Sequence, residues 1–168
     1  MVKMKTIDKD GLILCDMQAN AFEMSITAQG TSSEIFIRRF MNSDIVKKID
    51  NLDILQSNLQ AKDLLDIIDE EYGKSNYGSV KYTANEMYWI GYIYRYYAYT
   101  YGKSSVQVYK IIKPKELRAV FLPYHTMDPA QAIDRILEAK GLDCDAMNNE
   151  LKQYEIFKRV RKNAENIK

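Results

Sequence analysis

Residues 83–102 read TANEMYWIGYIYRYYAYTYG and predict the central helix of the fold. Thr83 and Glu86 stand at the spacing of a capping box, which marks the start of a helix, and Gly102 can end it. Between these ends lie seven tyrosines and the only tryptophan of the chain. A helix that is aromatic on nearly every side is typically buried among others, and Gly91 allows one of them to cross it closely. Stacking of nucleic-acid bases on the tyrosine rings is the alternative interpretation.

The rest of the chain carries apolar residues three and four positions apart in most long segments, which is typical of amphipathic helices. Only three prolines and seven glycines interrupt its 168 residues. We therefore expect an all-α protein, with residues 1–168 forming one compact multi-helix domain around the Tyr-rich central helix. The pattern leaves the structure of the N-terminal segment, residues 1–30, open. Residues there that could share one helical face are Leu14, Met17, Ala21 and Met24. Residues 143–168 are expected to form a terminal helix with a basic end.

Capping residues separate the other predicted helices. Pro114 and Pro129 stand at first-turn positions, and Gly73 and Gly141 can end helices. The candidates for the N-cap of the helix after residue 30 are Thr31, Ser32 and Ser33. The positions expected to face the core are Phe36, Ile37, Phe40, Met41, Leu64, Leu65, Ile67, Ile68, Ala132, Ile133, Ile136 and Leu137.

Composition places the chain among ordinary globular proteins, with 46% hydrophobic and 28% charged residues. No apolar run in the sequence approaches the roughly 18 residues that a membrane span needs, so no membrane association is expected. The basic first residues are followed at once by Asp8, Asp10 and Asp16, which is not typical of a secretory signal. A cytoplasmic location is the resulting expectation.

The sequence lacks the residues that metal and cofactor sites need. It contains two cysteines, Cys15 and Cys144, and one histidine, His125, at spacings that structural zinc sites do not use. Disulfides are also unusual in the reducing cytoplasm. We therefore expect no metal, no disulfide and no cofactor.

Charge is distributed unevenly along the chain. Residues 1–73 contain 8 Lys and Arg against 13 Asp and Glu, whereas residues 74–168 contain 16 against 10. The second part could present a basic face to nucleic acid, or the split could be incidental. In the first part, Asp66, Asp69 and Glu70 predict a solvated acidic face rather than a metal site, because hard cations usually take oxygen ligands from loops or several elements.

Residues 97–117, YAYTYGKSSVQVYKIIKPKEL, follow the pattern of a helix-turn-helix unit. Ala98 is small enough for a close crossing, and Gly102 can supply the positive φ of a tight turn. Val108 and Ile111 then stand six and nine positions after the glycine, where the second helix packs inward. Many structural corners between helices use the same devices, so a DNA-reading unit and a plain corner both remain open.

The second helix of this unit defines the candidate DNA-binding residues. Ser105 and Gln107 lie near its start, where side chains meet base edges in the major groove. Lys103, Lys110 and Lys113 would neutralise phosphates, which gives affinity without sequence information. The full set of positions expected to point outward is Ser104, Ser105, Gln107, Tyr109, Lys110 and Lys113.

Two longer stretches carry a resemblance to a known family: SSEIFIRRFMNSDIVKKID, residues 32–50, and the run from MYWIGYIYRYYAYTYG to DRILEA, residues 87–139. Over about residues 31–140 the chain resembles antitoxins of bacterial toxin-antitoxin operons. The resemblance implies a non-catalytic protein that masks a cognate toxin, binds operator DNA and so regulates transcription. It makes residues 31–50 or the two ends candidate toxin-binding surfaces. A homodimer is expected if the operator is a palindrome.

An enzyme is the rival interpretation. Arg118 and His125 resemble the Arg-x(4–6)-His signature of small all-helical ribonucleases, in which the arginine steadies a phosphate and the histidine transfers protons. Against it, Pro123 is expected to disrupt helical spacing between them, and His125 to be a turn residue bonded to the backbone. The sequence contains no G-x-S-x-G and no glycine-rich phosphate loop. We therefore expect no catalytic activity, with a purely protein-binding module as a further alternative.

Overall fold

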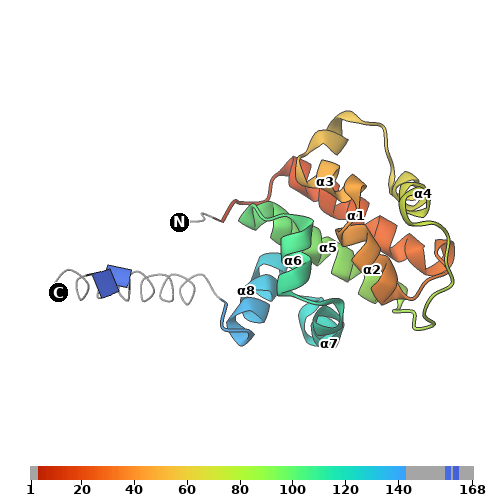
Figure 1. Cartoon of the computed structure of the whole chain (residues 1–168). Coiled ribbons are helices and arrows are strands. Elements are labelled where there is room, and N and C mark those ends of the chain that lie inside the picture. The colour runs from red at the N-terminus through yellow and green to blue at the C-terminus, as the bar shows by residue number, and fades with distance from the viewer. Residues whose placement is uncertain (1–3, 143–157, 160, 163–168) are drawn as a thin grey trace. The chain divides into compact units, whose positions relative to one another are not determined.

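The all-α prediction is confirmed in the computed structural model, which describes residues 4–142, 158, 159, 161 and 162. No strand occurs among these residues. The helices, shown in Figure 1, are α1 (Lys9–Ala28), α2 (Ser33–Met41), α3 (Asp44–Asp50), the 3-10 helix η1 (Asp53–Gln56), α4 (Ala61–Tyr72), α5 (Ala84–Tyr101), α6 (Ser105–Ile111), α7 (Pro114–Tyr124) and α8 (Pro129–Ala139). The chain divides into two compact units, residues 1–129 and 130–168.

The helix α5 is the predicted central helix, and α1, α6 and α7 all pack on it. Thr83 and Glu86 form the expected capping box, and Gly102 ends the helix. Most of its aromatic side chains are buried, because neighbouring helices cover it on several sides. The hydroxyl of buried Tyr94 donates to the carbonyl of Ile112 at 2.6 Å.

The closest helix crossing in the first unit joins α1 to α5 at Gly91. A Cβ atom on Gly91 would lie 2.8 Å from Cγ of Phe22 and 3.0 Å from the carbonyl oxygen of Gln18. The side chain of Gln18 donates to the Gly91 carbonyl at 3.0 Å, across this contact. Only glycine fits the crossing, as the sequence predicted.

Phenylalanines join α2 to the α1–α5 pair. The ring of Phe22 packs edge-on against Phe36 and Phe40, with centroids 5.4 and 5.1 Å apart. Ser32 is the N-cap of α2, and Ser43 is that of α3. The other expected core positions of α2 and α4 are buried as predicted, except for Ile67, which is half-buried.

The N-terminal segment, which the sequence left open, forms the 20-residue helix α1. Asp8 is its N-cap and accepts a hydrogen bond from the amide of Gly11 at 2.9 Å. Leu14 and Ala21 are buried in line with the pattern, whereas Met24 is 38% exposed. The tyrosine-rich helix also holds the residues before α1, because the hydroxyl of Tyr99 donates to Asp8 at 2.6 Å.

The helix α7 begins with Pro114 at its first turn and continues through Pro123 to Tyr124. The expectation that Pro123 would disrupt helical spacing between Arg118 and His125 is therefore wrong. Pro123 lies in the last turn of α7, where only Tyr124 follows it. The helix therefore tolerates the loss of one backbone amide donor.

The second unit contains nearly all of α8, whose expected apolar positions Ala132, Ile133, Ile136 and Leu137 are buried. Gly141 has the positive φ, 69°, of a residue that ends a helix. Of the predicted terminal helix, residues 158, 159, 161 and 162 are helical, and the remainder, with Cys144, lies outside the described residues.

Candidate functional site

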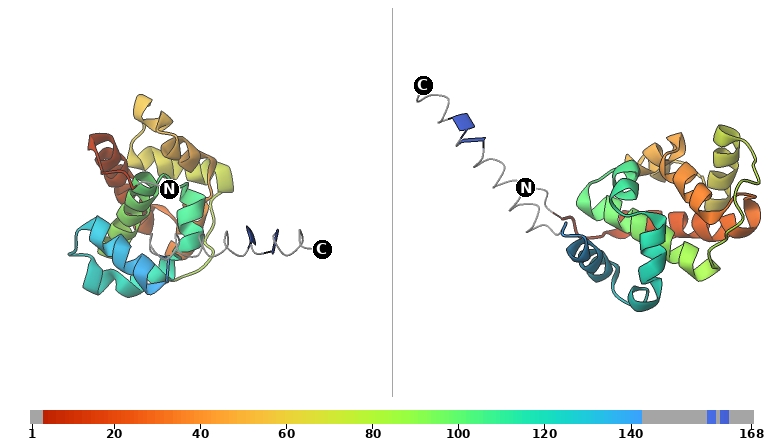
Figure 2. Two further views of the ribbon diagram at one scale, coloured as in Figure 1. Left: turned by 90° about the vertical axis from the view of Figure 1, so that its left-hand side faces the viewer. Right: turned by 60° about the horizontal axis from the view of Figure 1, so that its bottom comes forward.

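The predicted helix-turn-helix corner exists as a corner between α5 and α6. Gly102 adopts the left-handed conformation, with φ 63° and ψ 35°, and the next amide donates to the carbonyl of Ala98 at 2.9 Å. Ser104 then caps α6 and forms a capping box with Gln107. Ala98 and Val108 are buried, as the pattern predicted. Figure 2 shows α6 beside the end of α5 in both views.

The second inward position of the corner is not the one that the sequence predicted. Ile111 is only half-buried, whereas Ile112 is fully buried. The helix α6 ends at Ile111, and the backbone of Ile112 is extended, with φ −126° and ψ 112°. This change of backbone direction turns the side chain of Ile112 into the core and places the carbonyl of Ile112 where the hydroxyl of Tyr94 can donate to it.

The prediction that Ser105 points outward to read bases is wrong. Its side chain is fully buried, and its hydroxyl donates to Oδ1 of Asp50 at 2.7 Å. The amide of Ser105 donates to Oδ2 of the same carboxylate at 3.0 Å. Asp50, the last residue of α3, therefore covers Ser105 in the first turn of α6.

Ser105 belongs to a buried cluster, the Arg95 network, which consists of Gln18, Asp50, Arg95 and Ser105. The guanidinium of Arg95 is 2% exposed and donates to Asp50 at 2.6 Å, to Gln18 at 2.9 Å and to Ser105 at 2.7 Å. Burial lowers the pKa of Arg95, and the Asp50 carboxylate opposes that shift. The network links α1, α3, α5 and α6 through hydrogen bonds, so we assign it a structural role in stabilising the fold.

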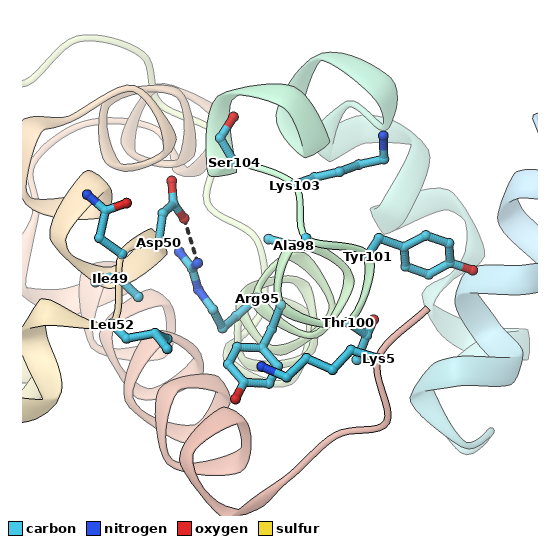
Figure 3. Close-up of a pocket in the computed structure, with 13 residues that line it drawn as sticks. Lys5, Ile49, Asp50, Leu52, Arg95, Ala98, Thr100, Tyr101, Lys103 and Ser104 are labelled. Carbon is cyan, nitrogen blue, oxygen red and sulfur yellow. Dashed lines mark hydrogen bonds and ion pairs between the residues drawn. The ribbon is translucent and has the colours of Figure 1, made fainter. Parts of the chain in front are cut away.

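A cavity of about 520 Å³ opens beside the Arg95 network. Figure 3 shows Asp50 and Arg95 facing each other at its wall, while the side chain of Lys103 points away from them. Lys5, at another wall, lies with its Nζ 4.1 Å from the centre of the Tyr99 ring. The charged side chains of Asp50, Arg95 and Lys5 at the cavity therefore already have interaction partners within the protein.

The remaining candidate DNA-binding residues lie on the outside of α6. Gln107, Lys110 and Lys113 are exposed, and Ser104, Lys103 and Tyr109 are half-buried. The ammonium of Lys113 lies 4.5 Å above the Tyr109 ring. Arg38 is exposed on α2, which packs on α6. Burial raises the pKa of Tyr109, and the charge of Arg38 opposes that shift. We call Arg38, Lys103, Lys110 and Lys113 the α6 basic face.

The ribonuclease pair is not assembled into one site. Arg118 pairs with Glu86, with Nε 3.2 Å from Oε2, and its guanidinium lies 4.3 Å above the ring of Tyr82. Burial raises the pKa of Glu86, but hydrogen bonds from Thr83 and Arg118 outweigh it and lower the pKa overall. Nδ1 of His125 lies 2.8 Å from the carbonyl oxygen of Phe121, so the expected backbone partner is confirmed. The two side chains line separate cavities.

The cavity that His125 lines was not predicted. It measures about 900 Å³ and lies among α1, α5, α7 and the turn that follows α7. We call it the aromatic groove; its lining residues are Glu23, Asn85, Tyr88, Trp89, Tyr92, Phe121, Leu122, His125, Met127 and Pro129. Leu122 on its rim is 78% exposed.

Aromatic rings on two helices form the walls of the aromatic groove. On α5, Tyr88 and Tyr92 stack with centroids 6.4 Å apart and an interplanar angle of 24°. Opposite them, Phe121 of α7 stacks at 4.5 Å on His125, the residue that follows the helix, and the edge of Phe121 meets Trp89. Burial raises the pKa of Tyr92 to about 12, with smaller contributions from neighbouring acidic groups. The walls are therefore apolar faces that stay partly open to solvent.

Within the described part of the chain, no group of three or more His, Cys, Asp and Glu side chains could hold a metal ion. The helices described there include none with the length and apolarity of a membrane span. Burial raises the pKa of the Cys15 thiol to about 12, which keeps it protonated. No family model, curated protein or solved structure matches this chain. The resemblance to antitoxins therefore stays a prediction.

Proposed function

We propose that the protein is a non-catalytic binding protein of the antitoxin type, which neutralises a toxin by direct contact through the aromatic groove. The observation that carries the proposal is the exposure of Leu122 at the rim of a groove lined by tyrosine, tryptophan and phenylalanine. Contiguous exposed apolar surface of this kind marks interaction sites in globular proteins.

The composition of the groove fits a protein partner. Tyrosine and tryptophan are enriched among the few residues that carry most of the binding energy of an interface. Trp89 is only 9% exposed, while Tyr88, Tyr92 and Phe121, which line the same groove, have intermediate exposure. A buried anchor with a partly exposed surround is the arrangement in which a partner side chain displaces water.

The proposal is tested with the protein encoded beside this chain's gene, the position that the antitoxin resemblance implies for a toxin. Leu122→Asp places a charge in the groove, and Val80→Asp places the same charge at an exposed apolar residue elsewhere, 57% exposed. Wild type and Val80→Asp should restore growth to cells that express the neighbouring protein and should bind it in titration calorimetry. Leu122→Asp should do neither. Equal rescue by both variants would contradict the proposal.

Operator binding through the α6 basic face is a second candidate, favoured by the exposure of Lys110 and Lys113 beside Arg38. Because Ser105 is buried, we expect phosphate contacts to supply most of the affinity, with sequence reading limited to Gln107 and its neighbours. Binding should then fall steeply as salt rises, through loss of counterion release.

Operator binding is tested on DNA upstream of the gene at about 50 and 200 mM salt. The variant Lys110→Glu/Lys113→Glu should lose binding at both concentrations. The matched control is Lys9→Glu/Lys62→Glu, which reverses two exposed lysines on α1 and α4. If both double variants bind as wild type does, the α6 basic face is not the DNA-binding surface.

A further inference from the structure

We propose that the aromatic groove recognises an arginine side chain, presented by the partner protein between apolar neighbours. This inference rests on the proposed function and adds the chemistry of the partner segment. It starts from the tyrosine rings that bind cations within the chain itself.

Within the described residues, four tyrosine rings carry a cation from the same chain. Arg39 lies 5.4 Å from the centre of the Tyr72 ring and Arg118 lies 4.3 Å from that of Tyr82. Lysines lie over two further rings, those of Tyr99 and Tyr109. A cation over an aromatic face is attracted by the ring's negative quadrupole. Tyrosine faces of this protein therefore bind cations both at the surface and at the buried Tyr82.

The two tyrosines of the aromatic groove have no such internal partner. Over the described residues, no Lys or Arg lies above the rings of Tyr88 or Tyr92, and none lines the groove. The two rings stack on each other, and Tyr92 also stacks on Tyr96, but both stay partly exposed, so an external cation can reach the parts of their faces that these stacks leave open.

The charges around the groove favour a cation. Glu23, exposed on α1, is the carboxylate among its lining residues. Asp16, two helical turns earlier on α1, accepts a hydrogen bond from the hydroxyl of Tyr88 at 3.2 Å. A cationic side chain entering over Tyr88 and Tyr92 would meet the carboxylate of Glu23 and no lining side chain of Lys or Arg.

Arginine fits better than lysine for two reasons. Its planar guanidinium stacks on aromatic faces and binds a carboxylate with two parallel hydrogen bonds. The chain also contains an internal example, because Arg118 lies over the Tyr82 ring while it pairs with Glu86. That example uses the same kinds of group, a tyrosine face and a glutamate, which Tyr88, Tyr92 and Glu23 supply in the groove.

The size of the groove requires more than one side chain. A volume of about 900 Å³ exceeds that of a single arginine several-fold, and Trp89, Leu122 and Met127 offer apolar contacts around the tyrosine faces. The partner segment is therefore expected to flank its arginine with aliphatic residues.

The experiment uses two short peptides that are identical except for one central position, arginine in one and its neutral isostere citrulline in the other, flanked by leucines. Trp89 is the only tryptophan of the chain, so its fluorescence reports occupation of the groove directly. Wild type should bind the arginine peptide at least about tenfold more tightly than the citrulline peptide, the ratio that one good charge-assisted contact provides.

Variants show whether the preference arises in the groove. Glu23→Gln should reduce the arginine preference, and Glu23→Lys should abolish it, whereas Glu70→Lys on the exposed face of α4 should leave it unchanged. Tyr92→Phe, which keeps the ring face, should retain the preference.

Equal affinity of wild type for both peptides would overturn arginine recognition, and so would binding of neither peptide. The growth-rescue comparison of Leu122→Asp with Val80→Asp decides the proposed function separately. If Leu122→Asp fails to neutralise the toxin while the peptides bind equally, the groove contacts the toxin but not through an arginine.

Discussion

The Arg95 network and the aromatic groove both use residues of the central helix α5. They differ in how many of their side chains have interaction partners within the chain. Arg95 is buried, and each of its guanidinium nitrogens has a hydrogen-bond partner within the protein. The groove, which uses Asn85, Tyr88, Trp89 and Tyr92 of the same helix, leaves tyrosine faces and the side chain of Leu122 partly open to solvent. A charged group whose hydrogen-bond partners all lie within the protein contributes to folding. Partly exposed aromatic surface, in contrast, is available for binding another molecule. This contrast makes the Arg95 network a structural element and the groove the candidate interface.

The largest effect is expected from breaking the Arg95 network. Arg95→Met removes the cation and leaves the Asp50 carboxylate without its ion-pair partner, so unfolding free energy should fall by about 3–5 kcal/mol. Urea denaturation followed by circular dichroism measures it. Combining Arg95→Met with Asp50→Asn should cost less than the sum of the two single variants, because the second change removes the stranded charge. Additive losses would show that the two groups act independently.

Gly91→Ala tests the crossing of α1 and α5, since α1 contributes residues to both the Arg95 network and the aromatic groove. The added methyl group would lie 2.8 Å from Cγ of Phe22, and overpacking of this kind costs about 1–3 kcal/mol. Denaturant titration gives the value. A second change, Phe22→Leu, should recover part of the loss in the double variant by removing the ring atoms from the contact. A neutral Gly91→Ala would mean that the helices can separate without penalty.

The sequence predicted the central helix, its caps and the Gly91 crossing, because each depends on residues within one or two helical turns. It could not predict that Ser105 is buried, since the carboxylate that covers it belongs to Asp50, 55 residues earlier in the chain. The corner pattern in the sequence covers only α5 and α6. It contains no information about the contact that Asp50 of α3 makes with Ser105.

The aromatic groove was missed for a related reason. Tyr88 and Tyr92 belong to the same tyrosine-rich helix as Tyr94 and Tyr97, and composition does not distinguish the partly exposed pair from the buried pair. Their exposure depends on where α7 lies relative to α5. The spacing of four between Tyr88 and Tyr92, repeated by Phe121 and His125, was the available signal that two aromatic stacks could face one space.

Alkaline pH should weaken the fold through its tyrosines, with a smaller effect per residue than either substitution. Burial raises the pKa of Tyr92 from 10.0 to about 12, and that of Tyr94 well above its usual value. The unfolded chain therefore loses these protons at lower pH than the folded chain does, so their stabilising contribution is complete below pH 10 and is lost as pH rises toward 12.

The melting temperature, measured beside the tyrosinate absorbance, follows this effect. It should decline from pH 10 upward, and Tyr92→Phe should shift the decline to higher pH. A melting temperature that stays constant between pH 10 and 12 would contradict the burial of these hydroxyls.

The smallest expected change in stability belongs to the groove itself. Leu122→Asp alters a side chain that is 78% exposed, so its unfolding free energy should stay within about 0.5 kcal/mol of wild type. A larger loss in urea denaturation would mean that Leu122 contributes to the core and would remove the contrast with the Arg95 network.

The most direct test of the central claim is calorimetric titration of Leu122→Asp, Val80→Asp and wild type with the protein encoded by the neighbouring gene. We expect wild type and Val80→Asp to bind it, and Leu122→Asp, although equally stable, not to bind it. Binding of the neighbouring protein by Leu122→Asp with unchanged affinity would show that the aromatic groove is not the interface.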